Sequence, residues 1–192
     1  MTEIHRAWYP TAIGLLEIQG TDEGILSVMF VEEGDNSGET GPLTNDERPL
    51  PSKKDFFPGC ERGAAQEASV PECLTACLQQ LDEYFRGTRK DFNVKLNPQG
   101  TQFQKQVWRK LPDIPYGKTA SYKDIAEAVG NPKAVRAVGG ANSQNPISII
   151  VPCHRIIGSN GKLTGYAGGL WRKEWLLAHE QKVHTSPEET PR

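Results

Sequence analysis

The chain has 192 residues and a formal net charge of -2, enough for one domain or two small ones. No apolar run reaches the ~20 residues that span a bilayer, and the N-terminus lacks a basic-then-apolar secretion signal. These features predict an intracellular globular protein. The charge is uneven, because residues 1–100 carry -8 and residues 101–192 carry +6. A basic C-terminal half favours contact with a polyanion, although a solvated basic face would give the same balance.

The N-terminal residues predict strands followed by a helix. Strands are expected at 15–19 and 25–31, joined by a turn at Thr21–Gly24, and the second is apolar at alternate positions of both faces, which predicts burial on both. A helix opens at Pro71 and closes at Gly87. One apolar face of this helix is formed by Leu74, Cys77, Leu78, Leu81 and Phe85.

Two further segments complete the expected N-terminal domain. Residues 32–70 are rich in Gly, Pro, Ser and acidic residues without periodicity, which predicts a long mobile loop. Residues 92–96 alternate as a further strand, and Asn97–Gly100 then breaks the chain. The expected organisation is a domain at 1–97, a second domain at 98–182 and a disordered tail at 183–192.

The second domain is predicted to be mostly helical. Capping boxes are expected at Thr101–Gln104 and, more weakly, at Ser121–Asp124. A short amphipathic helix follows at Tyr122–Gly130, and Asn131-Pro132 opens the next helix at Lys133–Asn142 by the N-cap and N1 preferences. Two short helices separated by such a turn form a helix-turn-helix pattern.

The second helix of this pair is made almost entirely of small residues. Gly139 and Gly140 are adjacent, and two glycines in a helix cost roughly 2 kcal/mol relative to alanine. Close approach to a nucleic-acid backbone would offset that cost, and so would tight packing against another helix. The sequence leaves both explanations open.

A candidate nucleophile follows an apolar stretch at 147–151. That stretch predicts a strand, which ends at Pro152 and presents Cys153, His154 and Arg155 together. Thiolate is the reactive form of cysteine, and an adjacent imidazole and a cation both favour it. The heptapeptide alone suits a catalytic or a structural cysteine about equally.

Glu180 is the candidate partner of His154. It falls in the last turn of a helix expected at 170–181, beside Leu176 and Leu177, where the helix dipole disfavours an anion. A Cys-His-Glu set supplies nucleophile, base and orienting acid, although the position of Glu180 alone favours a surface pair with Lys or Arg. Since adjacent side chains of a strand face opposite ways, Cys153 and His154 can cooperate only if the chain turns at Pro152 or a water bridges them.

The other three cysteines are expected to be reduced thiols. Cys60, Cys73 and Cys77 form no CxxC pair and have no secretory context. Zinc ligation by Cys73 and Cys77 is conceivable, but no histidine pair lies near, so apolar filling of a helix face is favoured.

Several motifs together resemble the O6-methylguanine-DNA methyltransferases. They are Asn145-Pro146, Pro152-Cys153-His154-Arg155, Tyr166–Gly169, Lys173–Glu180 and the helix-turn-helix from Ser121 to Gly140. The similarity is dense from Phe103 to Glu180 and looser from Thr11 to Phe85. It implies an α+β protein: a small ribonuclease-H-like α/β N-terminal domain, then a mostly helical winged-helix-like domain that contains the helix-turn-helix.

The resemblance implies DNA repair by direct transfer of the alkyl group from O6-methylguanine to Cys153. In that reading His154 is the base acting through a water, Glu180 orients His154, and Tyr122 pushes on the 3' phosphate and donates a proton toward the leaving guanine. The product is a thioether, which water does not cleave, so each protein molecule is expected to react once.

The resemblance also implies binding of the recognition helix in the minor groove and flipping of the damaged base. Arg136 would fill the vacated stack. The implied DNA contacts are Gln104, Tyr122, Lys123, Asn131, Arg136, Ala137, Gly139 and Ser159. The implied pocket residues are Asn145, Ser148, Ile156, Tyr166, Ala167 and Lys173, with Asn145 bracing the active-site turn.

Two departures from the family pattern affect these expectations. Some members hold a structural zinc, but the corresponding positions here are Thr21 and Leu26, so neither a zinc nor any other cofactor is expected. Ser148 stands where some members have proline, which leaves the range of alkyl adducts open. The expected partner is double-stranded DNA carrying O6-alkylguanine, bound by a monomer in the nucleus or the bacterial cytoplasm.

Two other functions are compatible with parts of the sequence. A thiol hydrolase or acyltransferase could use the same Cys-His-Glu set, but it would turn over and would not need a basic helix-turn-helix. A DNA-binding sensor without catalysis would not need Cys153. Methyl transfer with DNA binding separates the repair function from both.

Overall fold

The computed structural model describes residues 3–31 and 72–185. The expected loop at 32–70 lies outside the described residues, as does the tail from 186 onward. The chain divides into two compact units, Met1–Gln99 with Pro146–Ser148, and Gly100–Asn145 with Ile149–Arg192. No helix in the described ranges is both long and apolar enough to cross a membrane.

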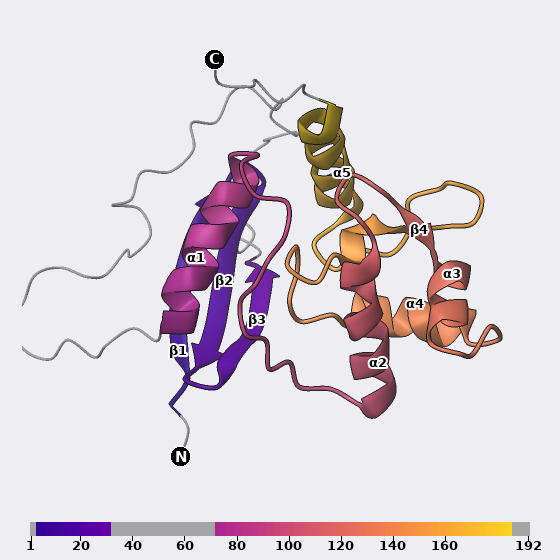
Figure 1. The fold of residues 1–192 in the computed structure, drawn as a ribbon, viewed down its shortest axis with the longest axis horizontal. Helices are drawn as coiled ribbons and strands as arrows, with labels where there is room; N and C mark the ends of the chain where they lie inside the picture. The colour runs from indigo at the N-terminus through magenta and orange to yellow at the C-terminus, as the bar shows by residue number, and fades with distance from the viewer. Residues whose placement is uncertain (1–2, 32–71, 186–192) are drawn as a thin grey trace, which may run out of the picture. The chain divides into compact units, whose positions relative to one another are not determined.

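The N-terminal unit is a three-stranded antiparallel sheet with one helix packed on it (Figure 1). Its strands are β1 (His5–Thr11), β2 (Gly14–Thr21) and β3 (Gly24–Phe30), in the order β1-β2-β3, and the helix is α1 (Glu72–Phe85). The predicted apolar face of α1 is confirmed, because all five of its members are buried. They close a core that contains Tyr9, Leu16, Ile18, Ile25 and Val28.

Two predictions for this unit are wrong in detail, and one strand was not predicted. Burial of β3 on both faces fails, because Ile25 and Val28 are buried while Leu26 and Met29 are only half-buried. Residues 92–96 form no strand and touch the sheet through a single parallel bridge from Leu96 to Ile25. The strand β1 went unpredicted, since Pro10 interrupts its alternation. Proline is tolerated there because β1 is an edge strand.

The C-terminal unit consists mainly of helices, as predicted. They are α2 (Gln102–Lys110), α3 (Tyr122–Ala128), α4 (Val135–Ser143) and α5 (Leu170–Thr185), with short 3-10 turns η2 (Leu111–Asp113) and η3 (Cys153–Arg155). Both capping boxes are confirmed, at Thr101–Gln104 and Ser121–Asp124. Strands β4 (Ala120–Ser121) and β5 (Ile156–Ile157) pair in parallel. The α+β fold class with a helix-turn-helix is therefore confirmed.

Two helix boundaries differ from the prediction. α4 starts at Val135, because Asn131–Ala134 forms a turn closed by the Ala134 amide donating to the Asn131 carbonyl at 2.9 Å. Proline suits the second position of such a turn as well as it suits a helix start. α5 continues to Thr185, so residues 183–185, which were expected to be disordered, belong to the helix.

Candidate active site around Cys153

The apolar stretch before Cys153 is a series of turns, so the predicted strand at 147–151 is wrong. Ile149 has a φ of 71°, a left-handed conformation that costs a β-branched residue of order 1–3 kcal/mol. Asn145 holds the turn by donating from Nδ2 to the Val151 carbonyl at 2.9 Å. Cys153 then begins the 3-10 turn η3, with Pro152 as its N-cap residue. The chain therefore turns at Pro152, one of the two arrangements in which Cys153 and His154 can cooperate.

His154 is fully buried and bound to Glu180 from α5. Its Nε2 lies 2.7 Å from Oε1 of Glu180, which is also fully buried. Among the described residues, Nδ1 of His154 has no hydrogen-bond partner. When Nε2 carries the proton donated to Glu180, Nδ1 presents a free lone pair and can act as a base.

Glu180 is also held by Arg155, which sequence analysis did not assign a role. The guanidinium donates from Nε to Oε2 at 2.9 Å and from Nη2 to Oε1 at 3.1 Å, and Nη1 donates to the Ile114 carbonyl at 2.7 Å. The Gly117 amide adds a further donor to Oε2 at 3.0 Å. This bidentate geometry is the strong form of the Arg–carboxylate pair, so Glu180 is a fixed, fully satisfied carboxylate.

The pKa shifts of this pair follow from its burial and its contacts. Burial raises the pKa of Glu180, but the hydrogen bonds and charges of His154 and Arg155 outweigh it and bring the pKa well below the ordinary range. Burial lowers the pKa of His154, and Glu180 opposes that only in part. The resting pair is therefore a carboxylate and a neutral imidazole.

Cys153 is a buried thiol whose pKa is raised by burial. A hydrogen bond from Asn145 and the charge of Lys173 oppose the rise without cancelling it. The prediction that adjacent His154 and Arg155 stabilise a resting thiolate is wrong, because both side chains bind Glu180. Ionising the sulfur therefore requires a base, and Nδ1 of the adjacent His154, unpartnered among the described residues, is a candidate for that role.

Among the described residues, Lys173 is the cation whose charge lowers the pKa of Cys153. Its side chain is fully buried, and Nζ donates to the Thr164 carbonyl at 2.7 Å. Burial lowers the pKa of Lys173 to about 8, and Cys153 opposes that shift. At neutral pH the ammonium form still prevails and favours a developing thiolate.

The other pocket residues named from sequence occupy different environments. Ile156 is buried in β5, Tyr166 is buried, and Ala167 is exposed in the loop before α5. Ser148 is buried in the segment that belongs to the N-terminal unit, where its amide donates to the Val28 carbonyl at 2.8 Å. The structure brings Asn145 and Lys173 to Cys153, while Ser148 has its backbone contacts in the sheet.

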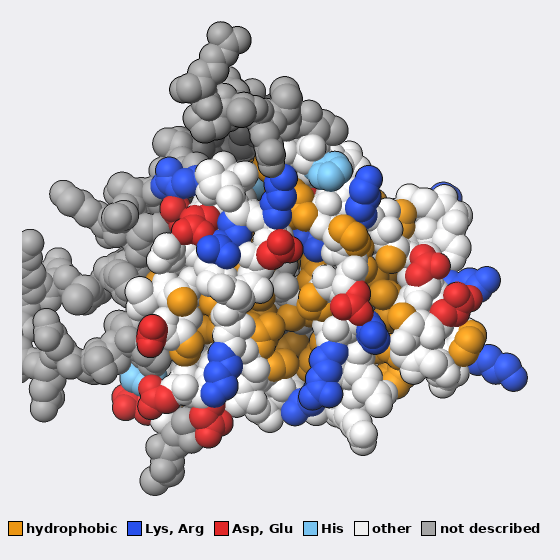
Figure 2. All heavy atoms as spheres, in the orientation of Figure 1, with side chains coloured by type: hydrophobic (Ala, Val, Ile, Leu, Met, Phe, Trp, Pro, Cys, Tyr) orange, Lys and Arg blue, Asp and Glu red, His pale blue; other side chains and the backbone are white. Residues whose placement is uncertain are grey.

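The residues expected to contact DNA are mostly exposed around α3 and α4. Arg136 and Ala137 are exposed on α4, Gly139 is half-buried, and Lys123, Asn131 and Ser159 are exposed nearby in the same unit. Gln104 is half-buried and engaged, with Oε1 accepting from the Thr101 amide and Nε2 bonded to Gln144. Lysine and arginine side chains lie among acidic ones on the face drawn in Figure 2, so charge alone does not mark a binding surface.

The small residues of α4 leave open space on one side. A Cβ added at Gly140 would meet nothing within 4 Å, and one at Gly139 would meet only the Tyr122 ring at 3.9 Å. Tight packing against another helix therefore does not explain Gly140, and close approach to an external surface is the explanation that stays.

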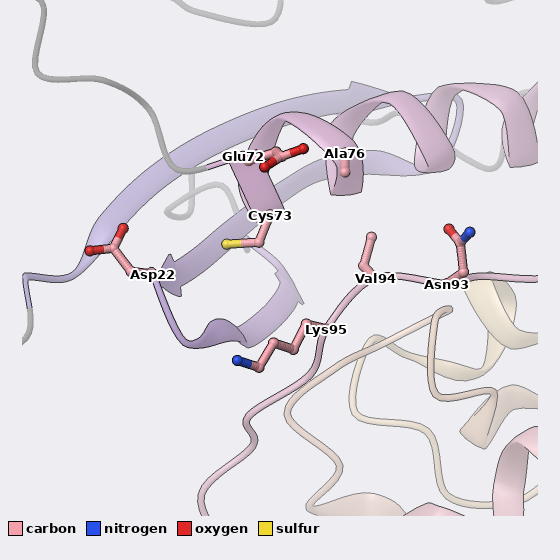
Figure 3. Close-up of a pocket in the computed structure, with 7 residues that line it drawn as sticks. All are labelled: Asp22, Glu72, Cys73, Ala76, Asn93, Val94 and Lys95. Carbon is pink, nitrogen blue, oxygen red and sulfur yellow. The ribbon is translucent and has the colours of Figure 1, made fainter.

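A surface pocket of the N-terminal unit contains none of the predicted site residues. It is lined by Asp22, Glu72, Cys73, Ala76, Asn93, Val94 and Lys95 (Figure 3). Cys73 donates its thiol proton to the Thr21 carbonyl at 3.0 Å. The part of the chain that the structure describes has no group of three or more His, Cys, Asp or Glu placed to hold a metal ion; the absence of zinc stays a prediction.

Known proteins share these sequence features over most of the chain. Residues 102–182 match the family model described as 6-O-methylguanine DNA methyltransferase, DNA binding domain, and residues 4–98 match the ribonuclease-like domain of the same family. A methylated-DNA--protein-cysteine methyltransferase of Mycolicibacterium paratuberculosis is 41% identical over 170 residues, 88% of each chain. The chain belongs to the 6-O-methylguanine DNA methyltransferase family.

Further relatives agree with this assignment. A methylated-DNA--protein-cysteine methyltransferase of Methanosarcina acetivorans is 64% identical over 109 residues, 57% of this chain and 70% of the relative. The crystal structure of Mycobacterium tuberculosis O6-methylguanine methyltransferase superposes with a TM-score of 0.72 at 36% identity, covering 97% of each chain. A structure of the Mycobacterium tuberculosis protein in complex with DNA gives a TM-score of 0.70 at 37% identity over 92% of each chain.

For this member of the 6-O-methylguanine DNA methyltransferase family, sequence reasoning named the candidate nucleophile and did not assign all of the groups around it. Arg155 lies inside the recognised motif, and a cation beside a buried acid was a signal that could have assigned it to Glu180. The Gly117 amide and the Thr164 carbonyl are backbone groups, so residue type does not predict their contacts.

Proposed function

We propose that this chain repairs DNA by transferring the alkyl group of O6-methylguanine to Cys153, as a methylated-DNA--protein-cysteine methyltransferase. The observation that carries the proposal is a buried Cys153 thiol directly before a neutral His154 that Glu180 fixes at Nε2, leaving Nδ1 unpartnered. The relatives described above bear the name of this activity.

The geometry supports a sequence of proton transfers around one displacement. Nδ1 of His154 takes the thiol proton through a water, while Glu180 stabilises the imidazolium that forms. The sulfur then bonds to the alkyl carbon, and the bond from that carbon to O6 breaks with its electron pair on guanine. Tyr122 donates its phenolic proton toward the departing guanine, which leaves poorly as an anion at neutral pH.

Asn145 and Lys173 assist the sulfur in this scheme. Both lower the pKa of Cys153 against the larger effect of burial, so both stabilise the charge that develops on sulfur before the bond forms. Burial also keeps bulk water away from the nucleophile, which suits a displacement at carbon.

DNA would be bound through α3 and α4, with α4 in the minor groove. The open space at Gly140 allows the helix backbone to approach closely, and the exposed Arg136 is available to replace a flipped base in the stack. A monomer suffices for this arrangement, because the proposed nucleophile, base, orienting acid and DNA-facing helix all belong to one unit of one chain.

The product fixes the stoichiometry. A thioether at Cys153 is not cleaved by water, so each molecule transfers one alkyl group and is consumed. Its substrate places the reaction where the genome lies, in the cytoplasm of a bacterium or the nucleus of a eukaryote.

Intact-protein mass spectrometry tests the proposal directly. After incubation with a duplex carrying one O6-methylguanine, the protein should gain one methyl group, the gain should stop at one per chain, and peptide mapping should place it on Cys153. An unchanged protein mass with the DNA demethylated over many turnovers would indicate a thiol hydrolase. DNA binding without any transfer would indicate a sensor.

A further inference from the structure

Tyr122 and Lys173 converge on one residue of the loop before α5, and that residue has no role in the reaction described above. The Tyr122 hydroxyl donates to the Thr164 carbonyl at 3.1 Å, and Lys173 Nζ donates to the same carbonyl oxygen at 2.7 Å. The hydroxyl of Thr164 donates in turn to the phenol oxygen of Tyr122 at 3.3 Å. All three residues belong to the C-terminal unit.

We propose that Thr164 is a positioning residue for alkyl transfer, which holds the Tyr122 phenol through its carbonyl and stabilises the phenolate through its hydroxyl. The proposal rests on the proposed function, since it gives Tyr122 the proton that goes to guanine. Thr164 touches neither the alkyl group nor the sulfur in this scheme and acts through Tyr122.

The carbonyl of Thr164 explains how the phenol can be held and still be released. A carbonyl oxygen has two lone pairs, and here Lys173 and Tyr122 each donate to it. When the phenol turns its proton to the guanine, the carbonyl keeps the shorter of its two bonds, the one to Lys173. Release of Tyr122 therefore leaves no backbone acceptor without a partner.

The hydroxyl of Thr164 has its effect after the proton has moved. Once the phenolic O–H bond has broken toward guanine, the phenol oxygen carries a negative charge and accepts the hydrogen bond from Thr164. A hydrogen bond to a charged oxygen is stronger than one to a neutral oxygen, so this contact strengthens as the guanine leaves. Such a difference between the resting state and the transition state accelerates the chemical step without tightening DNA binding.

The ring of Tyr122 is placed for this exchange by α4. The nearest side-chain atoms to a Cβ at Gly139 are in the Tyr122 ring, and a Cβ at Gly165 would lie 3.5 Å from the Tyr122 hydroxyl oxygen. The phenol thus lies between the DNA-facing helix and the loop that contains Thr164, so movement of either on DNA binding reaches the proton donor.

Single-turnover kinetics at saturating protein separate the chemical step from DNA binding. Thr164→Val, which keeps the carbonyl and the side-chain shape but removes the hydroxyl, should slow methyl transfer about fivefold, the effect of one lost hydrogen bond of about 1 kcal/mol. DNA affinity should stay within twofold. Thr164→Ser should restore the wild-type rate, and Thr88→Val is the matched control, since that exposed hydroxyl bonds only the Glu83 carbonyl among the described contacts.

A double-mutant cycle identifies the route of the effect. In a Tyr122→Phe background, Thr164→Val should cost no further rate, because the hydroxyl then has no phenol oxygen to stabilise. An unchanged rate in Thr164→Val, or the same fivefold loss in both backgrounds, would overturn the proposal. Absence of methyl transfer in the wild-type protein would instead overturn the proposed function.

Discussion

Cys77 and Cys153 are both buried, but the groups around their sulfur atoms differ. Cys77 lies in the core between α1 and the sheet, where burial and, to a smaller extent, the neighbouring Cys73 raise its pKa to about 12. Burial also raises the pKa of Cys153, but there Asn145 and Lys173 act in the opposite direction. A low resting pKa therefore does not distinguish Cys153, the proposed nucleophile, from Cys77. The groups that lower the cost of ionising the sulfur do.

The first test is to remove each of the two thiols. Cys153→Ser should abolish methyl gain completely, because serine is a far weaker nucleophile in a site that must ionise it. Cys77→Ala should keep at least half of the wild-type rate and lower stability by about 1 kcal/mol, the cost of a small cavity. Mass spectrometry after reaction with O6-methylguanine duplex measures both. Methylation of the Cys153→Ser protein at Cys77 would contradict the distinction between the two sites.

Glu180, the carboxylate proposed to orient His154, provides the second test of this comparison. Glu180→Gln should slow transfer about 100-fold, the low end of what general base catalysis contributes. It should also destabilise the fold by about 3 kcal/mol, since it leaves the Arg155 charge buried without its counter-ion. Chemical denaturation and single-turnover rates check the two effects. The matched control is Glu83→Gln, whose ion pair with Arg89 is part-exposed and screened by solvent, so its loss should have little effect on stability.

Lys173 should show a conflict between stability and function. Lys173→Met keeps the buried stem and removes the ammonium, so transfer should slow about tenfold because the thiolate loses its nearby cation. The folded pKa of Lys173 is about 8 and the unfolded value is about 10.4, so the unfolded state binds more protons between those values. Lys173 therefore contributes a rise in stability as pH increases from about 8 to 10.4.

The comparison of wild type with Lys173→Met isolates that contribution from other groups that titrate there. The free energy of unfolding should rise less from pH 7.5 to pH 10 in the variant than in the wild type. At pH 7.5 the variant should be at least as stable as the wild type. A variant that loses stability at pH 7.5 would show that the ammonium stabilises the fold and that its burial is not costly.

Sequence patterns located the side chains of the proposed site better than they predicted the backbone that positions them. The motif around Cys153 and the inward position of Glu180 in α5 follow from residue type and spacing. The turn at 147–151 does not, because Ile149, Ile150 and Val151 have high β propensity and only tertiary contacts impose a left-handed Ile149. The late start of α4 and the contacts of the Thr164 carbonyl could not be predicted for a related reason, since both depend on backbone hydrogen bonds.

The smallest effect is the most direct measure of how burial tunes the base. An imidazole with the ordinary pKa of about 6.5 would be about three-quarters protonated at pH 6.0, and the transfer rate would fall to about a quarter of its maximum. Burial lowers the pKa of His154 below that value, so single-turnover transfer at pH 6.0 and saturating protein should keep clearly more than a quarter of the maximal rate. The pH dependence of folding stability has the same direction as that of the rate. His154 does not affect stability above about pH 6.5, and stability declines as pH falls below that value, because only the unfolded state then binds the proton. Glu180 adds a second decline, since its depressed pKa contributes stability above about 4.3 that is lost as pH falls further. A rate at pH 6.0 below a quarter of the maximum would mean that Glu180 outweighs the effect of burial on the pKa of His154. The imidazole would then be charged over part of the physiological range, and proton removal from Cys153 would need another base.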